Sequence, residues 1–369
     1  MQNNDAELVM TDQPVRKPKG RGAKSSPPNR FEAVRLEDDF EQVEHDDEFF
    51  AAGHKLATQF LPDNSQSILS HNDSPDVGFD WSINPYRGCE HGCAYCYARP
   101  SHEYLGLNAG LDFESRILVK HDAPSLLRAA ISKPSWQGEI IVLSGVTDCY
   151  QPIERQYRLT RGCIEVMLAA RQAFGIVTKN ALVVRDLDLL EQAAGMNLVH
   201  VNVSVTTLDV GLARSMEPRT SLPEQRLGAI SQLAAAGVPV RALVAPIIPG
   251  LNDQEVPAIL SAVREAGASA ASYVLLRLPL SVRPVFHDWL AATFPEKLAK
   301  IESLIRSTRD GKMYESEFKT RQIGRGNYAE QIAQTFHVFA RKVGLEKSLP
   351  DLDVTRFERP DESGQKRLF

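Results

Sequence analysis

Three cysteines stand close together in the segment NPYRGCEHGCAYCYAR, at Cys89, Cys93 and Cys96. Thiolates are soft ligands that suit iron–sulfur clusters, zinc and Cu(I). A closed zinc site needs a fourth protein ligand, which His91 or His102 could supply. Three thiolates on a cluster of four irons leave one iron without a protein ligand, and a catalytic metal site keeps such an open position. The spacing therefore indicates a metal centre, with zinc and an iron–sulfur cluster both left open.

Length and composition limit the classes of protein to consider. The chain has 369 residues, a formal net charge of -5 and 43% hydrophobic residues, which fits one large or two smaller globular domains. No segment reaches the roughly 18 uninterrupted apolar residues of a membrane helix, and the first residues lack the apolar core of a signal peptide. We expect a cytoplasmic protein without a membrane partner. The mild acidity gives no global indication of nucleic-acid binding.

Short apolar runs alternate with amphipathic stretches from residue 78 onward. Six runs predict strands, at 79–84, 139–144, 174–179, 198–205, 239–248 and 272–278. Most are continuously apolar, which is typical of strands buried on both faces of a parallel sheet. Between them, 156–172 and 221–237 carry apolar residues at helical spacing. The alternation predicts an α/β domain over 78–280, either a doubly wound sheet or a partial (β/α) barrel.

The flanking regions have a different composition. Residues 1–60 are a basic block followed by an acidic block, and we expect a disordered charged leader there. After residue 280 the strand–helix alternation stops, and 287–307 and 327–345 read as helices. We therefore expect 281–369 to be a helical extension packed on the main domain, with a basic loop between its two helices.

Polar motifs follow the ends of the predicted strands. The cysteine segment follows the first strand, SGVTD the second, Lys179 ends the third, VTTLD follows the fourth and APIIPG ends the fifth. The carboxyl ends of parallel strands lie on one face of a barrel or open sheet. These segments, distant in sequence, are therefore expected to converge on one site.

The cysteine motif resembles a known family signature. C-x3-C-x2-C with Tyr95 before the last cysteine, on a loop after the first strand of an incomplete barrel, resembles the radical S-adenosylmethionine (radical SAM) superfamily. Within it, NPYRGCEHGCAYCYAR and GVTDCYQPIE resemble the group that includes spore photoproduct lyase, and GRGAKSSPPNRFE resembles an uncharacterised bacterial branch of that group. The resemblance covers about residues 79–280 and implies a partial (β/α)6 TIM-like barrel.

The resemblance implies a specific chemistry. Cys89, Cys93 and Cys96 would hold a 4Fe–4S cluster whose open iron binds S-adenosylmethionine. Reductive cleavage would give a 5′-deoxyadenosyl radical that abstracts hydrogen from a substrate, in a lyase or transferase-type enzyme of unassigned reaction. A flavodoxin or ferredoxin would donate the electron, and nucleic acid is one substrate class, as in photoproduct repair. The alternative from another class is an iron–sulfur or zinc protein for electron transfer or structural interaction, without radical chemistry.

The resemblance also implies cofactor-binding residues at the strand ends. They are Tyr95, Ser144, Gly145, Thr147, Asp148, Lys179, Ser204 and Glu217. Asp148 could accept from the ammonium of S-adenosylmethionine, and Lys179 could pair with its carboxylate. Glu217 could contact the cofactor or form a local ion pair with Arg219. Each of these residue types is also an ordinary loop or strand residue.

Cys149 is the candidate catalytic residue outside the cluster motif. Spore photoproduct lyase uses a cysteine near the end of its second strand as a hydrogen-atom donor, and Cys149 lies a few residues beyond that place. The alternative is a small apolar residue that fills the core.

Overall fold

The main sheet contains all six predicted strands and one further strand. In the computed structural model, which describes residues 20–31 and 57–360, the strand order is β10-β9-β8-β7-β6-β3-β2. The strands are β2 (Leu69–His71), β3 (Trp81–Ile83), β6 (Ile141–Leu143), β7 (Phe174–Thr178), β8 (Val199–Ser204), β9 (Val240–Ile247) and β10 (Ala270–Leu275). Neighbours from β3 to β10 are parallel, and β2 pairs antiparallel with β3. The predicted α/β fold is confirmed.

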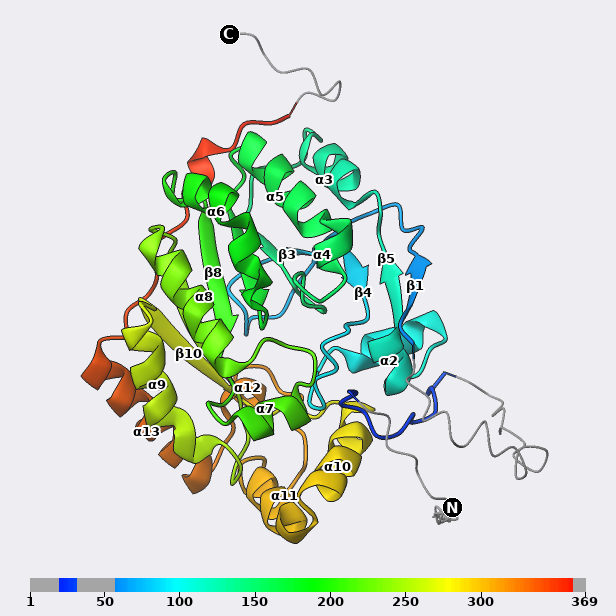
Figure 1. Ribbon diagram of the computed structural model, residues 1–369, viewed down its shortest axis with the longest axis vertical. Helices are drawn as coiled ribbons and strands as arrows, with labels where there is room; N and C mark the ends of the chain where they lie inside the picture. The colour runs from blue at the N-terminus through cyan, green and yellow to red at the C-terminus, as the bar shows by residue number, and fades with distance from the viewer. Residues whose placement is uncertain (1–19, 32–56, 361–369) are drawn as a thin grey trace, which may run out of the picture.

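The sheet curves into an open barrel. Its end strands β10 and β2 each pair with a single neighbour in this sheet, so the barrel does not close. Figure 1 shows the connecting helices along the outer side of the sheet. They include α3 (Ala123–Ile131), α5 (Leu159–Ala169), α6 (Leu187–Ala194), α8 (Pro223–Ala235) and α9 (Val256–Glu265). Of the two predicted architectures, the partial barrel is the one observed.

Burial follows the apolar pattern of the strands. In β8 the side chains of Val199, Val201 and Val203 are buried, whereas His200 and Asn202 between them are half-buried. All three residues of β6 are buried. Burying a valine or isoleucine side chain contributes about 1.5–3 kcal/mol, so the continuous apolar runs explain both why these segments are strands and why they are central.

A second, smaller sheet lies beside the barrel and was not predicted. Its strands are β1 (Gln59–Pro62), β5 (Arg116–Val119) and β4 (Tyr86–Arg87), in the order β1-β5-β4. Strand β4 comes directly before the cysteines. The 3-10 helix η2 (Arg99–Leu105) and helix α2 (Leu111–Ser115) come directly after them and lead into β5. The cysteine loop is therefore part of an excursion that leaves the main sheet after β3 and returns to it at β6.

Two predicted helices are each divided in the structure. The segment 156–172 forms α4 (Glu154–Tyr157) and α5, separated at Arg158, whose φ is 53°. The segment 287–307 forms α10 (Val282–Thr293) and α11 (Leu298–Ser307), separated at Phe294 and Pro295. A left-handed residue interrupts a helix, and proline cannot continue one.

The remaining long helix of the C-terminal region is α13 (Asn327–Val343). It packs against α9, and its Phe336 ring lies 4.8 Å from the ring of Tyr273 in β10. In the described part of the chain no helix is long and apolar enough to cross a membrane.

The N-terminal region differs in part from the predicted disordered leader. Residues 20–31 pack against the cysteine loop, and β1 belongs to the small sheet, so the prediction does not hold for these residues. Residues 1–19 and 32–56, which make up most of the predicted leader, lie outside the described residues.

Candidate cofactor-binding site

The three cysteines of the motif lie on one irregular loop between β4 and η2. Cys89 and Cys93 are 6% and 7% exposed, and Cys96 is half-buried. Burial raises the pKa of each thiol, and at Cys89 the neighbouring Asp148, Cys96 and Cys93 add to the rise. The three thiols therefore share one largely water-free space. A metal that binds there would deprotonate them and release protons.

Two glycines give this loop its tight path. Gly88 and Gly92 have φ values of 79° and 64°, which side chains rarely adopt. A Cβ at Gly88 would lie 2.8 Å from the ring of His102, and one at Gly92 would lie 2.6 Å from the Glu114 carboxylate. Any larger residue at either position would displace the loop.

The histidines considered as fourth zinc ligands bind elsewhere. His91 Nδ1 lies 3.3 Å from the Asp148 carboxylate, and its Nε2 lies 3.0 Å from the side-chain amide of Asn180. His102 Nε2 lies 2.9 Å from the Arg116 carbonyl oxygen, and burial lowers the pKa of this imidazole to about 4. Among residues 20–31 and 57–360, no three His, Cys, Asp or Glu side chains are placed to hold a metal ion. His91 has both ring nitrogens engaged and does not fit as a zinc ligand, whereas His102 Nδ1 is buried without a hydrogen-bond partner among the described residues.

The donor set fits an iron–sulfur cluster better than a single ion. Each thiolate of such a cluster binds a different iron, so the three sulfurs need not converge on one point. Lys179 lies near enough to lower the pKa of Cys93 and Cys96, and Arg99 does the same at Cys96. These two cations would offset the negative charge of thiolates bound to a cluster.

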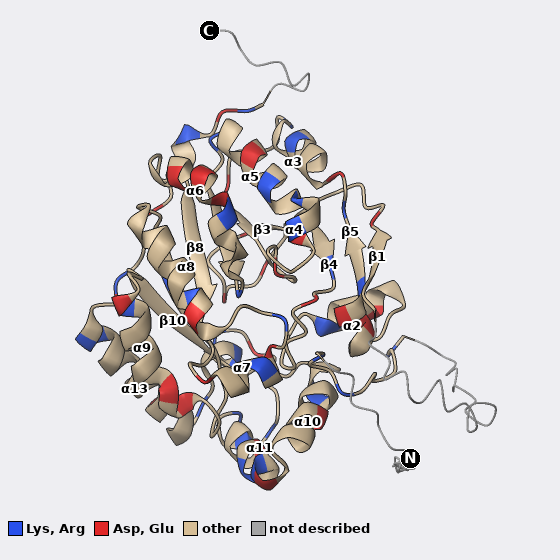
Figure 2. Cartoon of the chain, in the orientation of Figure 1, with Lys and Arg blue, Asp and Glu red and all other residues tan. Residues whose placement is uncertain are grey.

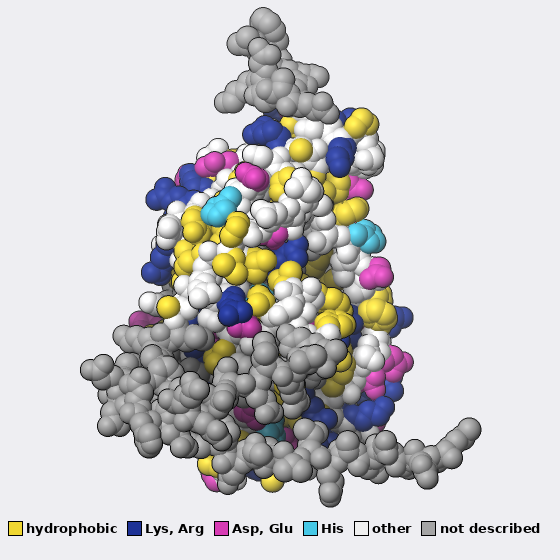
Figure 3. All heavy atoms as spheres, turned by 90° about the vertical axis from the view of Figure 1, so that its right-hand side faces the viewer, with side chains coloured by type: hydrophobic (Ala, Val, Ile, Leu, Met, Phe, Trp, Pro, Cys, Tyr) yellow, Lys and Arg dark blue, Asp and Glu magenta, His cyan; other side chains and the backbone are white. Residues whose placement is uncertain are grey.

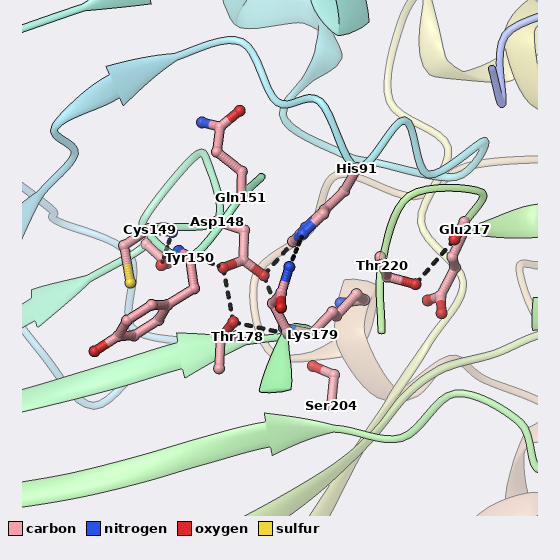
Figure 4. Close-up of polar contacts among 12 residues, drawn as sticks. His91, Asp148, Cys149, Tyr150, Gln151, Thr178, Lys179, Ser204, Glu217 and Thr220 are labelled. Atoms are coloured by element: carbon pink, nitrogen blue, oxygen red, sulfur yellow. Dashed lines mark hydrogen bonds and ion pairs between the residues drawn. The ribbon is translucent and has the colours of Figure 1, made fainter. Parts of the chain in front are cut away.

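Asp148 lies at the centre of a hydrogen-bond network at the ends of β6 and β7 (Figure 4). Its carboxylate accepts from Thr178 Oγ1 and from the Lys179 N–H, both at 2.7 Å, and from the Tyr150 N–H at 2.9 Å. His91 also faces it. Burial alone would raise the pKa of Asp148, but His91 and these donors outweigh burial and lower it to about 2. With its oxygens so engaged, Asp148 is suited to position its neighbours rather than to receive a ligand's ammonium.

The turn after β6 is shaped by buried polar groups. Ser144 has a φ of 83°, and its hydroxyl accepts from the Cys149 N–H at 2.9 Å. A Cβ at Gly145 would lie 2.8 Å from Ser82 Oγ, so only glycine fits there. Thr147 is buried, and its hydroxyl donates to the Tyr86 carbonyl oxygen at 3.3 Å. These contacts place the backbone of the turn beside the cysteine loop.

The Tyr97 hydroxyl joins the turn to the cysteine loop by donating to the Gly145 carbonyl oxygen at 2.8 Å. Tyr97 is 51% exposed, and its phenol donates as a neutral group at physiological pH. The two predicted segments, separated by nearly fifty residues in sequence, therefore meet directly.

A second buried carboxylate lies on the other side of the thiols. Glu217 pairs with Arg226, accepts from the Tyr95 hydroxyl, and accepts from Thr206 Oγ1 at 2.8 Å. Burial would raise the pKa of Glu217, but Arg226 and Lys179 outweigh burial and lower it. Tyr95 and Glu217, predicted separately as cofactor-binding residues, thus contact each other.

Glu217 does not form the local ion pair with Arg219 that was expected as the alternative to a cofactor contact. Glu217 pairs with Arg226, whereas Arg219 lies 3.5 Å from the carboxylate of Glu90, the residue after Cys89. Glu217 and Glu90 are therefore both compensated by arginines from the segment that follows β8.

Lys179 and Ser204 stand at the ends of adjacent strands. The Lys179 ammonium lies 5.9 Å from the centre of the Tyr95 ring and is half-buried. Ser204 is 1% exposed, and its backbone carbonyl oxygen accepts from Arg226 at 3.0 Å. Both residues lie where the parallel strands bring the predicted motifs together, although this geometry does not by itself assign a ligand to either.

Cys149 does not face the site. Its side chain is fully buried in the main core, and its carbonyl oxygen accepts from Thr160 of α5 at 2.6 Å. Figure 4 shows Asp148 directed toward His91 while Cys149 leaves the same turn in another direction. The predicted hydrogen-donor role does not fit this placement, because a donor must reach the substrate. The alternative, a small core residue, fits it.

Sequence reasoning missed several residues of the site. The main ones are His91 as a partner of Asp148, Asn180, Arg226 and Glu114. Arg226 did carry a signal, because it stands three, four and seven residues before the buried Ala229, Ile230 and Leu233. A charged residue on the apolar face of a helix needs a buried partner. Glu114 lies outside a regular amphipathic pattern and gave no such signal.

Comparisons with known proteins agree with this geometry. The family model described as Radical SAM superfamily matches residues 83–263. The uncharacterized protein Rv2578c of Mycobacterium tuberculosis is 38% identical over 230 residues, which is 62% of this chain and 68% of that protein. The uncharacterized protein MJ0683 of Methanocaldococcus jannaschii is 29% identical over 225 residues, 61% of this chain and 80% of that protein.

Two solved structures of spore photoproduct lyase are similar to this chain in fold. A variant of spore photoproduct lyase superposes with a TM-score of 0.54 at 15% identity, covering 85% of each chain. Spore photoproduct lyase complexed with dinucleoside spore photoproduct superposes with a TM-score of 0.53 at 16% identity, covering 78% of this chain and 81% of that one. At these identities the likeness concerns the fold.

Proposed function

The chain belongs to the radical SAM superfamily, and from that premise we propose that it is an enzyme that binds a 4Fe–4S cluster through Cys89, Cys93 and Cys96. The observation that carries the proposal is the set of three thiols on one largely buried loop, with His91 between them engaged by Asp148 and Asn180. When bound, the cluster supplies the electron that cleaves S-adenosylmethionine to a 5′-deoxyadenosyl radical, which abstracts hydrogen from the substrate. A small electron-transfer protein such as flavodoxin or ferredoxin would supply that electron.

The strand ends offer groups suited to hold S-adenosylmethionine. The Lys179 ammonium could pair with its carboxylate, since it is half-buried and close enough to influence two of the thiols. The Ser204 hydroxyl and the backbone of the turn at Ser144–Thr147 are the other polar groups on this face. Asp148 and Glu217 would not contact S-adenosylmethionine themselves. They would fix Lys179 and Tyr95 in place by hydrogen bonds. Charge-assisted hydrogen bonds of this kind are stronger than neutral ones.

The surroundings of the thiols exclude water, as radical chemistry requires. Cys93, Ala94 and Tyr95 pack with Met216 and Leu276 in one apolar cluster. A radical in such a space meets few groups other than the substrate, and the low polarity strengthens the nearby ion pairs.

Nucleic acid is the first substrate class to screen, because the fold is shared with spore photoproduct lyase in complex with a dinucleoside photoproduct. The charge distribution gives little further support. Blue and red positions are interspersed along the cartoon in Figure 2, and dark blue and magenta side chains are both scattered over the face shown in Figure 3. In the basic loop after α11, Arg321 pairs with Asp76 and Arg325 with Glu317. A phosphate backbone would need unpaired cations.

The test uses three forms of the full chain. These are the natural protein, the triple variant Cys89→Ala/Cys93→Ala/Cys96→Ala, and the matched double variant Cys149→Ala/Cys163→Ala, which removes the other two cysteines of the sequence. Each is reconstituted anaerobically with iron and sulfide, and iron content and EPR spectra are recorded. Dithionite and S-adenosylmethionine are then added, and 5′-deoxyadenosine is measured.

The proposal expects the natural protein and the double variant to bind the cluster and release 5′-deoxyadenosine, and the triple variant to do neither. A natural protein that stays colourless, or that binds one zinc, would overturn the proposal. A brown protein that never cleaves S-adenosylmethionine would favour the electron-transfer alternative. Loss of 5′-deoxyadenosine in the double variant, with the cluster still bound, would assign a role to Cys149 or Cys163, and the two single variants would tell which.

A further inference from the structure

Residues 20–31 cross the outer side of the cysteine loop, and we call this segment the strap. In Figure 1 it is the dark blue stretch between α2 and α10. The contact with the loop is backbone against backbone. A Cβ at Gly22 would lie 1.7 Å from the carbonyl oxygen of Gly92 and 3.1 Å from the amide nitrogen of Ala94. No side chain fits between the two segments there, so Gly22 is required for this contact.

The strap and the loop share one buried carboxylate. Glu114 in α2 accepts from the N–H groups of Gly22 and Ala23 at 3.0 and 2.7 Å, and from Arg99 Nη2 at 2.5 Å. Arg99 is fully buried and also donates to the carbonyl oxygen of Cys93, at 2.8 and 3.1 Å. A continuous chain of hydrogen bonds therefore runs from the strap backbone to the middle cysteine.

Further contacts anchor the strap at both ends. The Gly20 carbonyl oxygen accepts from Arg219 at 3.3 Å, and Arg219 in turn faces Glu90 beside Cys89. The Ser25 hydroxyl donates to Asp288 of α10. Near the far end, Arg30 pairs with Glu103 of η2 at 2.7 Å. The strap thus ties the loop to η2 and to the segment after β8 within the barrel, and to α10 after it.

The cysteine loop lacks strand pairing of its own, so these contacts have few substitutes. Within the loop, backbone hydrogen bonds join Gly92 to Cys89 at 3.3 Å and Cys96 to Cys93 at 3.2 Å. The N–H of Ala94 donates outside the loop, to the Met216 carbonyl oxygen at 3.0 Å. Gly92 and Ala94, which touch Gly22, flank Cys93 in the sequence. Whatever fixes the strap therefore also fixes the position of Cys93.

We propose that Gly22 and Ala23 of the strap are positioning residues for the cluster. They lock the backbone on either side of Cys93, hold the Glu114–Arg99 pair against its carbonyl oxygen, and keep water from the outer side of the loop. Groups behind the ligands and the exposure of a cluster to solvent tune its binding and its potential. This inference rests on the proposed function, and it adds a part from outside the barrel to the cluster site.

The test compares two glycine variants of the full chain. Gly22→Ala places a methyl group against the Gly92 carbonyl oxygen, whereas Gly228→Ala in α8 places the same group where no atom lies within 4 Å. Three properties are measured: hydrogen exchange of residues 88–98 in the metal-free protein, the rate of iron loss and bleaching in air after reconstitution, and the EPR spectrum of the reduced cluster. The melting temperature serves as the control for global folding.

We expect Gly22→Ala to speed exchange in the loop and to lose iron roughly tenfold to a hundredfold faster, with an altered EPR spectrum and an almost unchanged melting temperature. Gly228→Ala should match the natural protein. Glu114→Gln, which keeps the side-chain shape but replaces an acceptor with a donor, should shift the same three properties in the same direction. It provides the second test should Gly22→Ala fold poorly.

Two results would overturn the inference. Equal exchange, iron loss and EPR spectra in Gly22→Ala and the natural protein would show that the strap does not position the cluster. A fall in melting temperature with uniformly faster exchange in both Gly22→Ala and Glu114→Gln would show a purely structural role. Failure of the proposed function looks different, because the natural protein would then bind no cluster at all.

Discussion

The two sides of the candidate site are held in place by different means. On the strand side, Asp148 and Lys179 follow β6 and β7, and Ser204 ends β8; these strands are adjacent, parallel and in fixed register. On the loop side, Cys93 is held by side chains and by the strap, with little backbone pairing. A buried sheet transmits position through many contacts, whereas the loop depends on a few polar ones. The ligands of a cluster thus rest on the part of the site with fewer supports.

Each side contains one buried ion pair, which makes the comparison testable. Arg99 and Glu114 have side chains that are 0% exposed, and Arg226 and Glu217 are 2% and 0% exposed. In both pairs the arginine also donates to a backbone carbonyl oxygen of the site, that of Cys93 or Ser204. The pairs are alike in chemistry and differ in what surrounds them.

The largest effect on stability is expected from Arg226→Met. It leaves Glu217 charged and buried among the strand ends, which costs about 3–5 kcal/mol of unfolding free energy. Urea unfolding of the metal-free protein, followed by circular dichroism, measures it. Arg341→Met is the control, since Arg341 pairs with the exposed Glu346 and should lose at most about 1 kcal/mol. Equal losses in both variants would contradict the strand-side half of the comparison.

Arg99→Met should have a smaller global effect but a larger local one. The loop, the strap and η2 can open without unfolding the barrel, so the unfolding free energy should fall by about 1–3 kcal/mol. Hydrogen exchange should quicken in residues 88–115 and stay slow in β7 and β8. A loss as large as that of Arg226→Met, with faster exchange throughout the sheet, would show that the two sides are equally rigid.

Gly145→Ala tests how tightly the strand side is built. Its new methyl group would press on Ser82 Oγ of β3, and such overpacking costs about 1–3 kcal/mol. We expect the turn to shift and the affinity for S-adenosylmethionine, measured by equilibrium dialysis on the reconstituted protein, to fall about tenfold. The double variant Gly145→Ala/Ser82→Gly removes the obstructing side chain and should recover most of the affinity. Without such recovery, the steric explanation fails.

The smallest effect on stability is expected from Asp76→Asn, at a residue outside both sides of the candidate site. Burial alone would raise the pKa of this carboxyl, but the Lys319 N–H and Arg321 outweigh burial and lower it. The stability from this contact is therefore present above the ordinary carboxyl range and is lost as the pH falls through the lowered pKa. Asp76→Asn should lose about 1 kcal/mol at neutral pH and show a flatter loss of stability below about pH 4. An unchanged acid profile would contradict this.

The sequence predicted the strand side better than the loop side, for a physical reason. The six main strands coincide with short apolar runs, and β6 and most of β7 are buried on both faces, so the sequence pattern indicates them. Their order and polar ends then bring Asp148, Lys179 and Ser204 together. The cysteines were predicted from spacing and family resemblance, and the structure places all three on one loop.

What could not be predicted depends on contacts between distant residues. Strand β4 has two residues and β1 is exposed throughout, so neither carries an apolar pattern. The strap has the glycine, proline and lysine content of a disordered segment. Its order comes from Glu114, more than ninety residues away along the chain. Composition indicates whether a segment tends to be ordered by itself, and it carries no information about partners that are distant in the sequence.

The strap also bears on the order in which the molecule is completed. Residues 20–31 are synthesised before their partners, and Ser25 docks on Asp288, some 260 residues later in the chain. This contact of the strap therefore waits until α10 has been synthesised. The contacts of Gly22 and Ala23 with Glu114 need only the chain up to α2. The strap can thus be completed in two steps, first on the cysteine loop and later on α10.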